Sequence, residues 1–137
     1  IEQLDFLMGT LIEPTLGAHK PVIVEGFPSF QSSLAQQDPE DVRKTCRFEI
    51  YYKGLELGNG YFELRDPKEQ KRRMEEENSH RVEMGKSSLP LDKGLQEAMK
   101  AGLPKCAGVA MGFDRLLLLK QEKNSLEEVQ SFSWNHL

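Results

Sequence analysis

The sequence predicts an α+β fold in which helices flank a mainly antiparallel sheet. Two β-forming runs, 47–52 and 55–57, stand on either side of Lys53-Gly54, which is the spacing of a two-residue hairpin. Helical patterns begin at Asp66 and Asp92. The 137 residues, 38% of them hydrophobic, are enough for one compact core but not for two ordinary domains.

The beginning of the chain predicts a helix, a strand and a loop in that order. Apolar residues at helical spacing over residues 1–12 predict an amphipathic helix, which Glu13-Pro14 ends. The run Pro-Val-Ile-Val-Glu at 21–25 predicts a short, largely buried strand. Residues 28–42 are rich in Pro, Ser, Gln and Asp without periodicity, which favours a surface loop able to cover a site.

The hairpin fixes which side chains share a face of the sheet. A two-residue turn places Tyr51 opposite Glu56, so Glu49, Tyr51 and Glu56 are expected on the same face. Gly58-Asn59-Gly60 then predicts an interruption of the second strand, as a bulge or as a place where a ligand approaches the backbone.

Two helices are predicted in the middle of the chain. Asp66-Pro67-Lys68-Glu69 combines an N-cap aspartate, a proline in the first turn and a glutamate placed for a capping box. This helix should run to about Gly85. A second helix is expected from Asp92 to Lys100, with Gly102 as its stop.

A strand and two more helices are predicted at the end of the chain. Ala107–Phe113 is a small, glycine-punctuated apolar strand, and Arg115–Lys120 an apolar helix. Ser125-Leu126-Glu127-Glu128 forms a capping box that opens a short last helix, after which Phe132-Ser133-Trp134 should pack as a closing element.

Charge and cysteine content exclude several classes of protein. A net charge of −4 and a pI near 5.5 provide no overall field that attracts nucleic-acid phosphates. Cys46 and Cys106 have no metal-binding or disulfide spacing, so reduced thiols in a cytoplasmic protein are expected. No run approaches the roughly 20 apolar residues that cross a bilayer, so no membrane association is expected.

Residues 108–119 are the most informative segment of the chain. Small residues on a central strand let a flat base and an amino acid approach the backbone, and Arg115 at the following helix start meets phosphates. Taken alone, the pattern also fits ordinary core followed by an exposed ion pair. The segment resembles motif 3 of class II aminoacyl-tRNA synthetases, and this resemblance assigns ATP binding to Gly112 and Arg115.

Residues 47–67 resemble the segment that precedes motif 3 in lysyl-tRNA synthetases. The resemblance implies that Glu63 binds the side-chain ammonium of lysine, since related aspartyl enzymes carry an arginine there for a carboxylate. It also implies that Asn59 and Tyr61 line the amino-acid pocket, together with Ala110 of motif 3.

The same resemblance implies that Glu49 and Glu56 bind ATP through Mg²⁺, with Glu56 and Arg115 as catalytic groups. Carboxylate oxygens are ligands that Mg²⁺ accepts, and the ion neutralises phosphate charge during attack on the α-phosphorus. The alternative is that these glutamates are solvated strand residues.

Some residues are more similar to the branch of the family that modifies elongation factor P. They are Phe27–Gln36, with Ser33 in place of the usual proline, the sequence Tyr51-Tyr52-Lys53-Gly54, and Ala110 where synthetases have glycine. This resemblance implies an ATP-dependent ligase that activates lysine or β-lysine as the adenylate and transfers it to a lysine of elongation factor P. The alternatives are a lysyl-tRNA synthetase that charges tRNA and a non-catalytic binding module.

We expect residues 1–137 to be the C-terminal portion of a class II catalytic domain. They contain motif 3 and lack motifs 1 and 2, and the first residue already lies within a helical apolar pattern. The implied parent is a homodimer. The chain alone is expected to be inactive, because the motif 2 arginine that grips the α-phosphate is absent from it.

Overall fold

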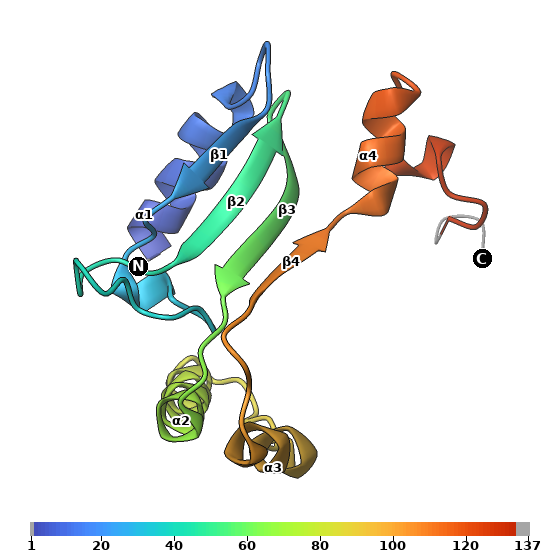
Figure 1. The fold of residues 1–137 in the computed structure, drawn as a ribbon. Helices are drawn as coiled ribbons and strands as arrows, with labels where there is room; N and C mark the ends of the chain where they lie inside the picture. Colours follow the sequence, from blue (N-terminus) through green and yellow to red (C-terminus); the bar gives the residue numbers. More distant parts are fainter. Residues whose placement is uncertain (1, 134–137) are drawn as a thin grey trace. The chain divides into compact units, whose positions relative to one another are not determined.

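The computed structural model describes residues 2–133 and has the predicted α+β class (Figure 1). Its four strands form one antiparallel sheet in the order β1-β2-β3-β4. The strands are β1 (Val22–Glu25), β2 (Arg47–Tyr52), β3 (Leu55–Phe62) and β4 (Ala107–Met111). The α-helices are α1 (Glu2–Leu7), α2 (Pro67–Glu83), α3 (Lys93–Ala101) and α4 (Phe113–Lys120).

The chain divides into two compact units. The first unit contains the segments 1–25, 48–60 and 109–137, of which 2–25, 48–60 and 109–133 are described. The second unit contains the segments 26–47 and 61–108. Most of the sheet lies in the first unit, and helices α2 and α3 lie in the second.

Strand β1 pairs antiparallel with β2, with Val22 opposite Tyr51 and Glu25 opposite Phe48. The prediction of a largely buried strand was wrong, because each residue of β1 is half-buried or exposed. Burial alternates along β1, and Ile23 is 62% exposed. The reason is that successive side chains point to opposite faces of the antiparallel sheet, and at β1 only one of these faces is partly covered.

The predicted two-residue hairpin is confirmed, because β2 ends at Tyr52 and β3 begins at Leu55. Both turn residues have positive φ, 50° for Lys53 and 72° for Gly54, as the favoured hairpin turn requires. Only glycine fits at the second position, since a Cβ on Gly54 would lie 2.9 Å from the carbonyl oxygen of Pro14.

The predicted interruption at Gly58-Asn59-Gly60 was wrong, because β3 runs through these residues without a break. Gly58 instead allows β4 to approach. A Cβ on Gly58 would lie 2.6 Å from the carbonyl oxygen of Ala110, a distance that real Cβ atoms do not reach. The placement of β4 on a central strand was also wrong: within the described residues it is the last strand of the sheet.

The first helix is shorter and less regular than predicted. Helix α1 ends at Leu7, Met8–Ile12 continue as a π-helical turn, and Glu13–Thr15 form a 3₁₀ turn that contains Pro14. The apolar stripe that predicted burial is partly open, with Leu11 64% exposed.

The segment predicted as a surface loop, 28–42, is partly packed instead. Ala35 within it is 0% exposed, and Thr45 just after it is 2% exposed. Isolated bridges join Gln37 to Thr45 and Ala35 to Glu63, and these long-range pairings have no periodic signature in the sequence.

Helices α2 and α3 begin as predicted. The Asp66 carboxylate accepts a 2.8 Å hydrogen bond from the Lys68 backbone N–H, and Asp92 accepts a 3.1 Å bond from that of Leu95. The capping box at α2 was wrong, because Glu69 accepts from Arg72 and Arg73 rather than from the Asp66 main chain.

At the end of the chain, the capping box of Ser125 and Glu128 is confirmed, on a 3₁₀ turn at Leu126–Glu128. Phe132 does not pack as predicted, since it is 82% exposed, and Trp134 lies outside the described residues. No helix among residues 2–133 has both the length and the apolar character to cross a membrane.

Candidate active site

In the first unit, Glu56 contacts two other predicted site residues, Asn59 and Arg115. The Asn59 amide donates a 3.1 Å hydrogen bond to Glu56 Oε1. Arg115 Nη1 donates a 2.5 Å bond to the backbone oxygen of Glu56 and lies 3.8 Å from its Oε2. The side chains of Glu56 and Arg115 are 33% and 45% exposed, so the pair adds little stability and remains accessible to a ligand.

This cluster is formed by one strand and one helix. Glu56 and Asn59 lie on β3, and Arg115 lies in the first turn of α4. Gly112 is the N-cap residue of α4, and its N–H donates a 2.8 Å bond to the Leu57 carbonyl on β3. That bond ties the helix start to the strand that carries Glu56.

Glu49 is a buried carboxylate on β2, with 7% of the residue exposed. The Tyr51 hydroxyl, on a residue 1% exposed, donates a 2.6 Å hydrogen bond to Glu49 Oε2. Burial, followed by the hydrogen bond to Glu49 and the charges of Glu49 and Glu13, raises the pKa of Tyr51 well above its usual value. The Tyr51 hydroxyl therefore stays protonated and acts as the donor.

Glu49 and Glu56 have donor atoms that suit Mg²⁺, which commonly binds through one or two carboxylates together with substrate phosphates and water. Among residues 2–133 no group of three or more His, Cys, Asp or Glu side chains is placed to hold a metal ion.

Ala110 lies exposed on β4, two residues before the Gly112 cap. Its neighbours Val109 and Met111 are also exposed, at 57% and 50%. Four of the five residues of this strand are therefore exposed within the described residues.

Tyr61 and Glu63 belong to the second unit, and both side chains are partly exposed. The backbone of Glu63 is fixed on two sides. Its N–H donates a 3.1 Å bond to the Cys106 carbonyl, and its carbonyl accepts a 2.8 Å bond from the Gln36 amide.

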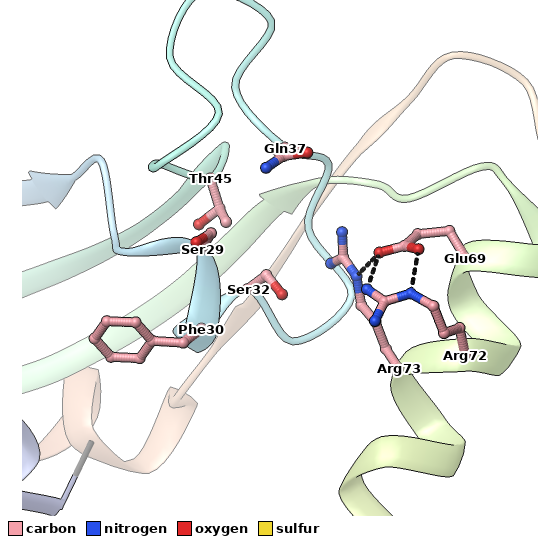
Figure 2. A pocket seen from close by; sticks show the side chains of 8 residues that line it. All are labelled: Ser29, Phe30, Ser32, Gln37, Thr45, Glu69, Arg72 and Arg73. Atoms are coloured by element: carbon pink, nitrogen blue, oxygen red, sulfur yellow. Dashed lines mark hydrogen bonds and ion pairs between the residues drawn. The ribbon is translucent and has the colours of Figure 1, made fainter.

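A cavity of about 270 Å³ also lies in the second unit, and Figure 2 shows its lining. Glu69 stands between Arg72 and Arg73, which lowers the pKa of its carboxyl to about 2, with the Arg72 hydrogen bond as the largest cause. None of the predicted site residues lines this cavity. Its remaining lining residues are Ser29, Phe30, Ser32, Gln37 and Thr45.

Two residues near the predicted site were missed by sequence reasoning. The hairpin register placed Tyr51 on the face of Glu49 but did not indicate that its hydroxyl binds that carboxylate. Gln36 gave no signal at all, because its bond to Glu63 joins residues that are 27 positions apart.

Comparison with known proteins identifies the family. A family profile described as "tRNA synthetases class II (D, K and N)" matches residues 7–136. Among curated relatives, a protein of Mannheimia succiniciproducens is 47% identical over 97% of this chain, and one of Haemophilus ducreyi is 49% identical over 94%. A Pasteurella multocida relative is 47% identical over 94% of the chain.

All three relatives carry the name elongation factor P–(R)-β-lysine ligase. The matches cover 41%, 39% and 40% of these relatives, so the chain spans about two fifths of their length. The family match, in contrast, extends over nearly the whole chain. The chain belongs to the class II tRNA synthetase family of the D, K and N type.

Proposed function

We propose that this chain is part of an ATP-dependent ligase that activates a lysine-type amino acid and transfers it to a lysine of elongation factor P. The observation that carries the proposal is the contact of Glu56 with both Asn59 and Arg115. This contact brings together the Arg115 guanidinium, which would bind phosphate, the Glu56 carboxylate and the Asn59 amide near the start of α4. The names of the three relatives support the choice of acceptor.

On this proposal, the chain is the C-terminal portion of a class II catalytic domain, with motif 3 on β4 and α4 and without motifs 1 and 2. Membership in the class II family supports ATP as the activating substrate. A homodimer is the proposed state of the complete enzyme, as the resemblance implies.

The first step joins the amino acid to AMP. The substrate carboxylate attacks the α-phosphorus of ATP, a P–O bond forms, and pyrophosphate leaves with the electrons of the broken P–O bond. Arg115 binds phosphate oxygens, and Glu49 and Glu56 would hold Mg²⁺, which neutralises phosphate charge when bound. The hydroxyl of Tyr51 restrains Glu49 in its place.

The second step transfers the acyl group. The neutral amine of a lysine on elongation factor P attacks the carbonyl carbon of the adenylate, an amide bond forms, and AMP leaves as the proton is released from the new amide nitrogen. Glu63 would bind the side-chain ammonium of the substrate, and Asn59, Tyr61 and Ala110 would shape the pocket around its carbon chain.

The test uses the protein expressed at its full natural length. We expect pyrophosphate exchange that depends on lysine or β-lysine, transfer to elongation factor P, and loss of exchange in Arg115→Ala. Transfer to tRNA(Lys) without transfer to elongation factor P would show that the protein is a lysyl-tRNA synthetase and not the proposed ligase. A folded protein that neither binds ATP nor supports exchange would be a non-catalytic module.

A further inference from the structure

Gly108 on β4 lies directly against the carboxylate of Glu63. An ideal Cβ built on Gly108 would be 2.5 Å from Glu63 Oε1 and 3.6 Å from Cδ of the same side chain. Real Cβ atoms essentially never come within 3.0 Å of a heavy atom outside their own residue and its two chain neighbours. A methyl group at position 108 would therefore clash with the Glu63 carboxylate in its present position. Both residues belong to the second unit.

The need for glycine at 108 does not come from the backbone. Gly108 is not among the glycines with positive φ, so its conformation suits any residue. Within the described residues, the two Glu63 atoms are all that a Cβ would meet within 4 Å. Gly58 differs, because its Cβ would meet the backbone oxygen of Ala110, which cannot move without the strand.

The main chain of Glu63 has little freedom to yield. Its N–H and carbonyl bond to Cys106 and Gln36, and its neighbour Leu64 donates a 2.9 Å backbone bond to Leu34. Leu64 is itself buried, with 8% of the residue exposed. A methyl group at 108 would thus displace the flexible end of the Glu63 side chain and leave the strand in place.

We propose that Gly108 is a positioning residue that sets where the Glu63 carboxylate stands, and thereby the selectivity of the site for amino acids that end in an ammonium. This inference rests on the proposed function of Glu63 as the partner of that ammonium. Gly108 supplies the empty space over which the carboxylate lies, while Gln36 and Cys106 fix the backbone from which the side chain extends. A charge-assisted contact depends on such placement, because its strength falls steeply with poor geometry.

The experiment is a double-mutant cycle of Gly108→Ala and Glu63→Gln in the protein at its full natural length. Amino-acid-dependent pyrophosphate exchange is measured with α-lysine, β-lysine and norleucine, which lacks the ammonium. We expect Gly108→Ala to raise the KM of the preferred lysine at least tenfold, and to leave the KM of ATP and any exchange with norleucine unchanged. In the Glu63→Gln background the same change should alter the lysine KM less than twofold.

Gly9→Ala is the matched control, since a Cβ there meets nothing within 4 Å, and it should leave every constant unchanged. An equal effect of Gly108→Ala in both backgrounds, or no effect on the lysine KM, would overturn the inference. A normal lysine KM in Glu63→Gln alone would instead show that the proposed function of Glu63 is wrong.

Folding is checked by thermal unfolding of each variant. If Gly108→Ala fails to fold, the clash with Glu63 must be the reason, and adding Glu63→Ala should restore folding. A double variant that remains unfolded would contradict the proposal, because the methyl group would then be harmful for a reason other than the carboxylate.

Discussion

The hydroxyl of Tyr51 is the smallest structural feature on which the candidate site depends. It donates to Glu49, a carboxylate with 7% of the residue exposed, and the raised pKa of Tyr51 keeps the proton on the hydroxyl. A buried carboxylate needs hydrogen-bond donors in place of the water that it has lost. The alternation of β2 predicts that the two side chains share a face, but it does not predict that this face is buried.

Tyr51→Phe should destabilise the protein by about 1–2 kcal/mol, since Glu49 would lose a short bond in a buried position. Urea unfolding at pH 7 measures the change in the free energy of unfolding. Tyr52→Phe is the control, because Tyr52 is half-buried and its hydroxyl makes no hydrogen bond to another residue within 2–133. Equal stabilities of the two variants would contradict a stabilising role for the Tyr51 hydroxyl.

In the protein at its full natural length, we expect Ala110 to determine which lysine isomer is activated. On the proposed function, its methyl group would take space that glycine would leave beside the α-amino group of α-lysine, whereas β-lysine carries that amine one carbon further along. One methyl group is worth about 1–3 kcal/mol of discrimination, so Ala110→Gly should raise activation of α-lysine by roughly tenfold or more. Pyrophosphate exchange with both isomers measures the ratio of kcat/KM, and an unchanged ratio would exclude this role.

Elements built from neighbouring residues were predicted well, and those that depend on distant partners were not. Lys53-Gly54 specifies the hairpin by itself, and Asp66 specifies the start of α2. The glycine at 58 was misread as a break, because its reason is the backbone of β4, about fifty residues away along the chain. In the site, the resemblance to the family selected Glu56 and Asn59, while their hydrogen bond and the Gly108 contact with Glu63 need the fold.

The ion pairs at the start of α2 should give the protein a defined acid response. Arg72 and Arg73 hold the pKa of the Glu69 carboxyl at about 2, below the ordinary value of 4.5 that applies in the unfolded chain. Because the pKa of the Glu69 carboxyl is lower in the folded than in the unfolded chain, its ionised form stabilises the folded protein above about pH 5. This stabilisation is lost as the pH falls toward 2. Glu69→Gln should therefore cost about 1 kcal/mol at pH 7, after solvent screening, and almost nothing at pH 2.

Unfolding by urea at several pH values measures this difference between Glu69→Gln and the unmodified protein. Glu75→Gln is the control, since its pair with Lys71 joins two side chains that are each 56% exposed, and it should leave the profile unchanged. A Glu69→Gln variant that loses as much stability at pH 2 as at pH 7 would show that the ion pairs are not the cause.

At the scale of the whole molecule, the predicted site residues are divided between the two units. Glu49, Glu56, Asn59, Ala110, Gly112 and Arg115 belong to the first unit, and Tyr61 and Glu63 to the second. The composition and the motifs predicted the class of fold and the family, because both depend on patterns of residues that are close together in the sequence. The division into two units had no local signature, since each unit is assembled from segments far apart in the sequence.

The 137 residues by themselves should catalyse no lysine-dependent pyrophosphate exchange and bind ATP weakly at best. Charge that develops at the α-phosphorus would lack the arginine that motif 2 supplies in the family. Exchange assays and ATP titration of this chain, beside the protein at its full natural length, measure the difference. Lysine-dependent exchange by the 137 residues alone would contradict the proposed division of the site.

The position of β4 in the sheet also predicts an order of events during folding. The β2–β3 hairpin closes through two residues, and hairpins of this kind form within about 1–10 μs. The pairing of β4 with β3, in contrast, joins residues that are far apart in the sequence, as the bond from Gly112 to Leu57 shows. Such contacts form more slowly, because a long loop has to close first. We therefore expect Glu56 and Asn59 to be in place before Arg115 arrives, so that docking of the last strand completes the candidate site.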